Sequence, residues 1–145
     1  KLVLALDGDG CFQMTMQELI TASTEDIPIK IALFNNGNHG MVRQWQKLFY
    51  NNRFSATELT HDTPDYVKLA ESMGAMAHRI STPDEIEEKF KDALNENSKP
   101  VLIEFVVDPD EMVFPMVPAG GNNDDVIVNE EAADSILNKD TAEEI

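Results

Sequence analysis

Two short polar clusters in this chain contain the residue types that could hold a ligand. The first, Gly-Asp-Gly, occupies residues 8–10, and the second, Asn-Asn, occupies residues 35–36. Each cluster follows an apolar run typical of a buried strand, and the 24 residues 11–34 separate them, enough for one helix and one strand. Ligands of an open parallel sheet bind beyond the carboxyl ends of its strands. The two clusters therefore predict one shared site.

The donors in these clusters suit a hard cation and a phosphate group. Asp9 offers an anionic carboxylate oxygen, and Asn36 offers a neutral amide oxygen. Magnesium prefers six oxygens and commonly binds one or two carboxylates together with substrate phosphates. Gly8 and Gly10 would let a ligand approach the backbone closely, with a positive φ where one is required. Together the clusters predict a magnesium diphosphate site, whereas Gly-Asp-Gly alone is most often only a turn.

Apolar runs alternate with amphipathic segments along most of the chain. We expect strands over residues 1–6, 29–34, 76–80 and 100–108. We expect helices over residues 14–24, 41–50, 63–74 and 81–97, the third ending at Gly74 and the last beginning near Pro83. Four strand–helix alternations predict an α/β fold, a mostly parallel sheet with helices on both faces. The run at 1–6 is typical of a strand that is buried on both faces.

The composition changes after Asp108. A segment rich in Pro, Gly and Asn follows, and residues 124–145 hold eight acidic residues and one lysine. We expect a domain over 1–123 and a peripheral acidic tail over 124–145, with a short helix capped by Asn129. Because the chain opens at Lys1 directly in a strand-like run, we also expect a fold truncated at its N-terminus.

The net charge of −16 argues against two classes of partner. Nucleic acids require clusters of Lys and Arg that neutralise phosphates, and anionic membranes require similar basic patches. No apolar run approaches the roughly 20 residues needed to span a bilayer. The single cysteine, Cys11, cannot form an internal disulfide, which favours a reducing, cytoplasmic location.

The stretches around both clusters resemble one enzyme family. Gly-Asp-Gly followed by Asn-Asn resembles the diphosphate-binding motif of thiamine diphosphate enzymes. The stretches GDGCFQMTMQEL, NNGNHGMVRQWQKLFYNNRFS and FPMVPAGGNNDDVI resemble the catalytic subunits of the acetolactate synthases, also called acetohydroxyacid synthases. This resemblance extends to about residue 128 and implies the C-terminal, diphosphate-binding domain of such a subunit.

The resemblance implies a role for residues in and after each cluster. Asp9, the side chain of Asn36 and the backbone carbonyl of Asn38 would bind magnesium. The cofactor-binding set would be Gly8, Asp9, Gly10, Cys11, Asn36, Asn38, His39, Gly40 and Met41. Val42 and Trp45 would line the substrate pocket, with Trp45 shaping the site for a second 2-ketoacid. Helical spacing alone would instead place Met41, Val42 and Trp45 in the core.

The activity implied by the resemblance is that of a transferase in branched-chain amino acid biosynthesis. Thiamine diphosphate and Mg²⁺ would support decarboxylation of pyruvate and its joining to a second 2-ketoacid, pyruvate or 2-ketobutyrate. The complete enzyme also binds FAD, outside this domain, and pairs with a second catalytic subunit and a possible regulatory subunit. The activating glutamate of the family lies in another domain, so no catalytic residue is expected here and the chain alone would be inactive.

Two alternative functions remain open at this point. The first is another thiamine diphosphate-dependent decarboxylase or carboligase. The second is a non-catalytic module that binds the cofactor or assembles with another chain. The stretch GMVRQWQ, which is far more specific than the two short clusters, favours the acetolactate synthase interpretation.

Overall fold

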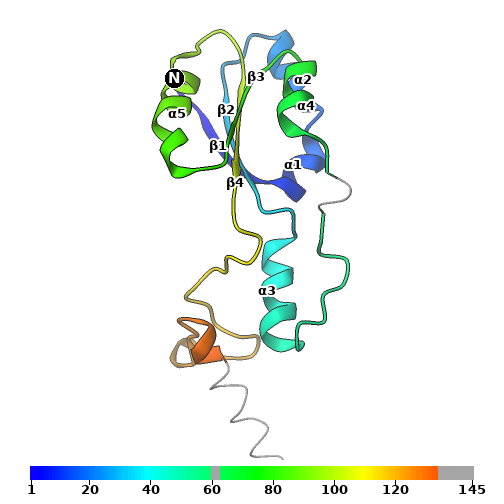
Figure 1. Ribbon diagram of the computed structural model, residues 1–145, viewed down its shortest axis with the longest axis vertical. Coiled ribbons are helices and arrows are strands. Elements are labelled where there is room, and N and C mark those ends of the chain that lie inside the picture. Colours follow the sequence, from blue (N-terminus) through cyan, green and yellow to red (C-terminus); the bar gives the residue numbers. More distant parts are fainter. Residues whose placement is uncertain (60–62, 134–145) are drawn as a thin grey trace, which may run out of the picture. The chain divides into compact units, whose positions relative to one another are not determined.

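A computed structural model of the chain describes residues 1–59 and 63–133. The chain divides into two compact units. The first comprises Lys1–Asn38 and Glu58–Pro109, and the second comprises His39–Thr57 and the described residues from Asp110 onward. Figure 1 labels the helices and strands of both units.

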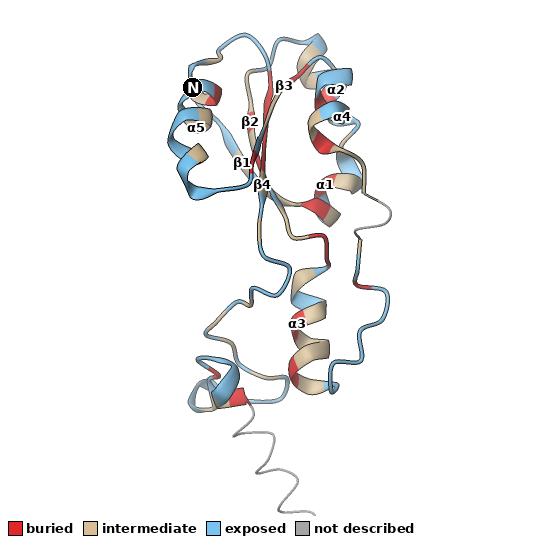
Figure 2. Ribbon diagram, viewed as in Figure 1, coloured by how far each residue is buried: buried red, intermediate tan, exposed pale blue. Residues whose placement is uncertain are grey.

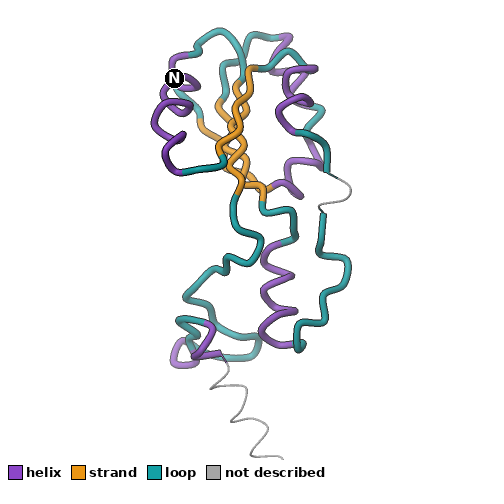
Figure 3. Tube along the Cα trace, viewed as in Figure 1, coloured by secondary structure: helices purple, strands orange, loops and turns teal. Residues whose placement is uncertain are grey.

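The first unit is built on a four-stranded parallel sheet (Figure 1). Its strands are β1 (Leu4–Gly8), β2 (Lys30–Asn35), β3 (Met76–Ile80) and β4 (Val101–Val106), in the order β1-β2-β4-β3. One face carries α5 (Ile86–Asn95), and the other carries α1 (Asp9–Thr15), α2 (Glu18–Thr24) and α4 (Tyr66–Ser72) (Figure 3). This arrangement confirms the predicted α/β fold with helices on both faces.

Alternate residues of β4 face the two helical layers. Leu102 packs in a cluster with Phe12 and Tyr66, whereas Ile103 packs with Ala93 of α5. Because successive residues of a strand point to opposite faces, a near-continuous apolar strand suits a sheet that is covered on both sides. Figure 2 shows β4 buried over most of its length.

The first helical segment differs from the prediction. The helix expected over 14–24 is two shorter helices, and α1 begins directly after Gly8 rather than at residue 14. Phe12 of α1 and Leu19 of α2 are both buried in the same core cluster. Each short helix is therefore anchored by its own apolar residue, a pattern that a search for one long amphipathic stripe does not detect.

The signals expected at two other helix ends are confirmed. Gly74 has a φ of +83°, the left-handed conformation that commonly follows a helix, and its N–H donates to the carbonyl of Glu71. Before α5, a 3₁₀ turn, η1 (Pro83–Glu85), begins with a capping box formed by Thr82 and Glu85.

The strand β1 is not buried on both faces as expected. Leu4 and Leu6 are 42% and 69% exposed. β1 lies at the edge of the sheet and pairs with β2 alone, while α5 packs on β3 and β4. The face of the sheet that α5 covers at β3 and β4 is thus uncovered at Leu4 and Leu6.

The second unit is built around α3 (Gly40–Phe49). This helix was expected among those that cover the sheet, but it belongs to the other compact unit. Its core cluster joins Leu48 to Ile127 and Ala133, and a β-bridge pairs Ile127 with Met116. The unit also contains a short 3₁₀ turn, η2 (Asn123–Asp125).

The first part of the expected acidic tail contributes to this core. Ile127 and Ala133 are fully buried. The side chain of Asn129 accepts a hydrogen bond from the N–H of Ala132 at 2.8 Å, as the predicted cap requires. The remainder of the expected helix, from residue 134, lies outside the described residues, and the division at residue 123 stays a prediction. No helix within residues 1–59 and 63–133 is long and apolar enough to cross a membrane.

Candidate functional site

The two polar clusters lie at the carboxyl ends of two neighbouring parallel strands, on the same side of the sheet. β1 and β2 are parallel, and Gly8 at the end of β1 pairs with Phe34, one residue before the end of β2. Asp9 is the first residue beyond β1, and Asn36 is the first residue beyond β2. A shared ligand requires this placement, because residues at opposite ends of the sheet could not meet one ligand.

Asp9 opens α1 and is buried, with 2% of its surface exposed. The backbone carbonyl of Asp9 accepts a hydrogen bond from the Tyr66 hydroxyl at 3.4 Å, and Gln13 donates to the same hydroxyl at 2.8 Å. The rings of Phe12 and Tyr66 meet edge to face with 6.0 Å between centroids. Burial raises the pKa of Tyr66, so its hydroxyl stays protonated and able to donate. Tyr66 therefore holds the first turn of α1 in place.

The glycines of the first cluster have ordinary backbone conformations. Gly8 has a φ of −92°, and Gly10 lies within α1. Neither glycine therefore adopts the positive φ that its residue type permits. A Cβ built on Gly8 would meet no atom within 4 Å, which leaves open space beside its backbone. Cys11, the next residue of the expected cofactor-binding set, is exposed.

The asparagine cluster forms a tight turn after β2. The side-chain oxygen of Asn35 accepts from the N–H of Gly37 at 3.1 Å, and that of Asn36 accepts from the N–H of Asn38 at 3.0 Å. The Asn38 amide donates back to the carbonyl of Asn36 at 2.9 Å. Gly37 has a φ of +66°, a conformation that favours glycine. These bonds fix the backbone that carries the oxygens of Asn36 and Asn38.

The donor set at this edge fits magnesium by its chemistry. Asp9, Asn36 and Asn38 would contribute a carboxylate, an amide oxygen and a backbone carbonyl, which are all hard oxygen ligands. Within the described part of the chain, no group of three or more His, Cys, Asp or Glu residues could hold a metal ion. An ion at this edge would therefore depend on amide, carbonyl and phosphate oxygens as well as on Asp9.

A buried polar network that no sequence pattern predicted is hydrogen-bonded to the asparagine turn. Glu104, 2% exposed on β4, accepts from the Asn35 amide at 2.7 Å and from Arg79 Nε at 2.6 Å. Arg79 also donates to Asp65 at 2.8 Å. The hydrogen bond to Glu104 is the main cause of a raised pKa at Arg79. A lone carboxylate within the apolar run PVLIEFVV was the signal that could have identified this network.

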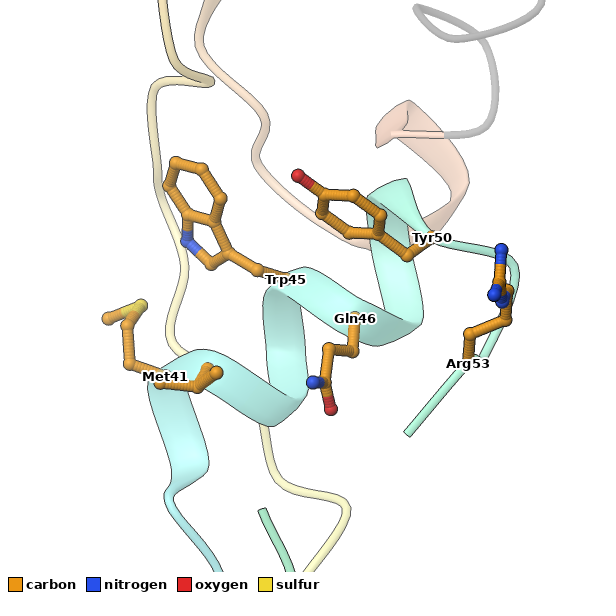
Figure 4. Close-up of a pocket in the computed structure, with 6 residues that line it drawn as sticks. Met41, Trp45, Gln46, Tyr50 and Arg53 are labelled. Atoms are coloured by element: carbon orange, nitrogen blue, oxygen red, sulfur yellow. The ribbon is translucent and has the colours of Figure 1, made fainter. Parts of the chain in front are cut away.

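The second unit contains a pocket of about 630 Å³ along α3 (Figure 4). Its lining residues are Met41, Val42, Trp45, Gln46, Tyr50 and Arg53. Met41 and Val42 are more than half exposed, and the partly buried ring of Trp45 meets Phe49 edge to face at 5.4 Å. The buried face of α3 instead carries Gln44 and Leu48. The core positions that helical spacing alone assigned to Met41 and Val42 are therefore wrong, whereas Trp45 is only partly buried.

His39 and Gly40 begin the second unit. His39 is the residue before α3, and its backbone N–H donates to the carbonyl of Thr57 at 2.8 Å. Gly40 is the first residue of the helix. The expected cofactor-binding set is thus divided between the units, since Asp9, Asn36 and Asn38 belong to the first. That set as a whole stays a prediction.

Comparison with known proteins indicates one family. The family described as thiamine pyrophosphate enzyme, C-terminal TPP binding domain, matches residues 1–105. The chain is 52% identical over 129 residues to the acetolactate synthase large subunit of Corynebacterium glutamicum. It is 49% identical over 125 residues to the probable acetolactate synthase large subunit of Methanocaldococcus jannaschii. These alignments cover 87% and 86% of this chain and 21% of each relative.

A solved structure agrees with the sequence matches. The thiamine diphosphate-dependent 4-hydroxybenzoylformate decarboxylase of Rhodococcus jostii RHA1 superposes with a TM-score of 0.69 at 29% identity, covering 77% of this chain and 21% of that one. The chain thus spans about a fifth of the length of the curated relatives it matches. With the matched residues 1–105 and the parallel sheet they form, the chain belongs to the family of C-terminal TPP-binding domains of thiamine pyrophosphate enzymes.

Proposed function

We propose that this chain is the diphosphate-binding domain of an acetolactate synthase catalytic subunit. The observation that carries the proposal is the placement of Asp9 and Asn36 beyond the paired ends of β1 and β2, within a chain about half identical to acetolactate synthase large subunits. Fold alone does not assign function, but here the family and the site geometry support the same ligand.

The first unit supplies the proposed metal anchor. Asp9, the Asn36 side chain and the Asn38 carbonyl would hold Mg²⁺, an ion that commonly binds one or two carboxylates together with phosphate oxygens. The backbone at Gly8, Gly10 and Cys11 would bind the diphosphate, and the open space beside Gly8 leaves room for it. His39, Gly40 and Met41, the other residues of the proposed cofactor-binding set, belong to the second unit.

The bound cofactor supplies the chemistry that decarboxylates one 2-ketoacid and joins the remainder to another. This chain's own residues bind the cofactor and orient the substrate. Val42 and Trp45 form an apolar wall of the pocket along α3, and this wall contacts the second 2-ketoacid, pyruvate or 2-ketobutyrate. No residue here is proposed to activate the cofactor, so the isolated chain is expected to be inactive.

The wider setting of this function is also part of the proposal. The complete enzyme takes part in branched-chain amino acid biosynthesis in the cytoplasm, binds FAD elsewhere, and pairs with a second catalytic subunit and a regulatory subunit. The term "large subunit" in the names of the Corynebacterium glutamicum and Methanocaldococcus jannaschii proteins supports the presence of further subunits.

A second candidate is another thiamine diphosphate-dependent decarboxylase. The likeness to the Rhodococcus jostii decarboxylase favours this alternative, but at 29% identity it is much more distant than the acetolactate synthases. Analysis of the products that the complete gene product forms from pyruvate distinguishes the two candidates. Acetolactate supports the first, and release of an aldehyde without carbon–carbon bond formation supports the second.

The test of the metal anchor is Asp9→Ala in the complete gene product. Asp9 supplies the only full charge among the proposed protein ligands, so the variant should lose Mg²⁺-dependent binding of thiamine diphosphate in titration calorimetry. Glu71→Gln, which neutralises an exposed carboxylate on α4, should bind as the wild type does. An unchanged affinity of Asp9→Ala for thiamine diphosphate in the presence of Mg²⁺ would show that Asp9 is not a ligand of the ion.

A further inference from the structure

We propose that Glu104 is a positioning residue that orients the asparagine turn for the cation. This inference rests on the proposed function, since it assigns a role toward the ion that Asn36 and Asn38 are proposed to hold. The residues involved, Asn35, Arg79 and Glu104, lie on three neighbouring strands of the first unit.

Glu104 occupies the centre of the sheet with both carboxylate oxygens hydrogen-bonded. β4 lies between β2 and β3, and Glu104 is in register with Leu33 on one side and with Arg79 on the other. One oxygen accepts from Asn35 and the other from Arg79, at 2.7 Å and 2.6 Å. Burying a charge is costly unless it is paired and hydrogen-bonded, and both conditions are met here.

The carboxylate determines which way the Asn35 amide points. An ionised carboxylate only accepts hydrogen bonds, so the NH₂ group of Asn35 must face Glu104. The oxygen of Asn35 is then directed away from Glu104, where it accepts from the N–H of Gly37 at 3.1 Å. A flipped amide would place its oxygen against Glu104 and leave the Gly37 N–H without this acceptor.

The orientation of the Asn35 amide affects the proposed ligands through the hydrogen bonds of the turn. Gly37 lies between Asn36 and Asn38, so the bond from Gly37 to Asn35 restrains the backbone on both sides of it. A second pair of bonds in the same turn joins Asn36 to Asn38: the Asn36 side-chain oxygen accepts from the Asn38 N–H, and the Asn36 carbonyl accepts from the Asn38 side chain. These bonds restrain the backbone that carries the Asn38 carbonyl. Arg79 in turn is held by Asp65, the residue that caps α4.

A purely structural role is the competing explanation. Buried ion pairs can often be replaced by apolar residues without loss of stability, so burial of Glu104 does not by itself establish a stabilising role. A positioning role makes a different prediction. Removing the charge should raise the Mg²⁺ concentration needed for cofactor binding, even where the melting temperature of the cofactor-free protein changes little.

The experiment compares Glu104→Gln with the wild type in the complete gene product. Calorimetry measures thiamine diphosphate binding as a function of Mg²⁺ concentration, and thermal melting measures the cofactor-free protein. Groups that orient metal ligands typically change metal affinity 10- to 100-fold when they are altered. We expect the Mg²⁺ concentration for half-saturation to rise at least tenfold, with faster hydrogen exchange at the Gly37 N–H.

Two further variants make the outcome decisive. Asn35→Ala removes the amide but leaves the Glu104–Arg79 pair, and it should raise the Mg²⁺ requirement by a similar factor, even if Glu104→Gln fails to fold. Lys30→Met removes another buried charge, from the same strand as Asn35. Lys30 donates to the carbonyl of Glu96 at 2.5 Å, and its replacement should leave the Mg²⁺ requirement unchanged.

The results separate this inference from the function on which it rests. If the wild type shows no Mg²⁺-dependent binding of thiamine diphosphate, the proposed function fails. If the wild type binds but Glu104→Gln and Asn35→Ala bind equally well, only the positioning role is overturned. A lower melting temperature in both variants with an unchanged Mg²⁺ requirement would likewise assign the network to stability alone.

Discussion

At the scale of single residues, Trp45 has two candidate roles: it could contact substrate in the pocket, or it could pack the core. The indole is only partly buried, lines the pocket along α3, and touches the ring of Phe49. Phe49 in contrast packs against the core cluster around Leu48 and Ile127. The two aromatic residues are four positions apart on one helix, which makes them a matched pair for substitution.

We predict that Trp45→Leu in the complete enzyme lowers the preference for 2-ketobutyrate over pyruvate as the second substrate. One methylene in an apolar pocket contributes about 1–3 kcal/mol, or roughly 10- to 200-fold in preference. Competition between the two acceptors measures the product ratio, and a thermal melt measures stability. Pyruvate decarboxylation should continue.

Phe49→Leu is the matched control for Trp45. It should lower the melting temperature, because it removes a ring from the core of the second unit, and leave the product ratio unchanged. If Trp45→Leu behaves in the same way, with a large fall in melting temperature and an unchanged ratio, then Trp45 packs the core and does not select the substrate.

At the scale of elements, α3 holds the segments on either side of it through two glutamine side chains. Gln44, 3% exposed, bonds both the N–H and the carbonyl of Val113, at 2.9 Å and 3.0 Å. Gln46 bonds the N–H and the carbonyl of Ser55, at 3.2 Å and 3.0 Å. Each amide thus replaces the backbone partner that a neighbouring strand would provide.

We predict that Gln44→Leu destabilises the second unit by about 1–3 kcal/mol, because it removes two hydrogen bonds to Val113, each with a net contribution of about 0.5–1.5 kcal/mol. Hydrogen exchange should accelerate at the Val113 N–H and remain unchanged at the Ser55 N–H. Gln46→Leu should show the reverse pattern. Equal exchange at both amides in both variants would mean that neither side chain holds its segment in solution.

The capping box before α5 makes the stability of this element depend on pH. Hydrogen bonds from Lys89 and from the N–H groups of Ser81 and Thr82 lower the pKa of Glu85 from 4.5 to about 2. A carboxylate whose pKa is lower in the folded state stabilises the fold above its unfolded pKa. This contribution is present above pH 4.5 and is lost as the pH falls toward 2.

We predict that Glu85→Gln reduces the dependence of stability on pH in this acidic range. Urea unfolding of the wild type should show a larger loss of stability between pH 5.5 and pH 3 than unfolding of the variant. Glu87→Gln, which alters an exposed carboxylate paired with Lys91 on the same helix, serves as the control. An identical loss in the wild type and Glu85→Gln would show that the capping interaction does not form.

At the scale of the whole molecule, a strongly acidic chain carries one apolar strand at the edge of its sheet. The net charge of −16 favours solubility. Leu4 and Leu6 nevertheless remain exposed on β1, together with Leu2 and Val3 before it. An apolar edge strand presents unpaired backbone groups and apolar side chains to other chains.

We predict that the isolated 145-residue chain self-associates through β1 and that Leu6→Lys shifts it toward the monomer. A charge on an exposed edge strand opposes strand pairing between chains. Sedimentation velocity measures the distribution of species. Met14→Lys, which changes an apolar residue that is 72% exposed on α1, should not shift the distribution. A monomeric wild type would refute this prediction.

The sequence by itself determined the features that depend on local pattern. Apolar runs marked the four strands, Gly74 marked a helix end, and the capping residues before Pro83 marked a helix start. The spacing of Asp9 and Asn36 also placed both residues beyond the same edge of the sheet, as the structure does. Such features follow from backbone preferences and side-chain periodicity, which neighbouring residues carry.

Only the tertiary structure decided which distant residues meet. The order of the strands left β1 at the edge and brought Glu104 to Arg79 and Asn35, which lie 25 and 69 residues away along the chain. Packing in the second unit buried Ile127 from the expected tail. Tyr66 likewise reaches Asp9 across 57 residues. No local pattern encodes these contacts, because they depend on how strands and helices pack once the whole chain has folded.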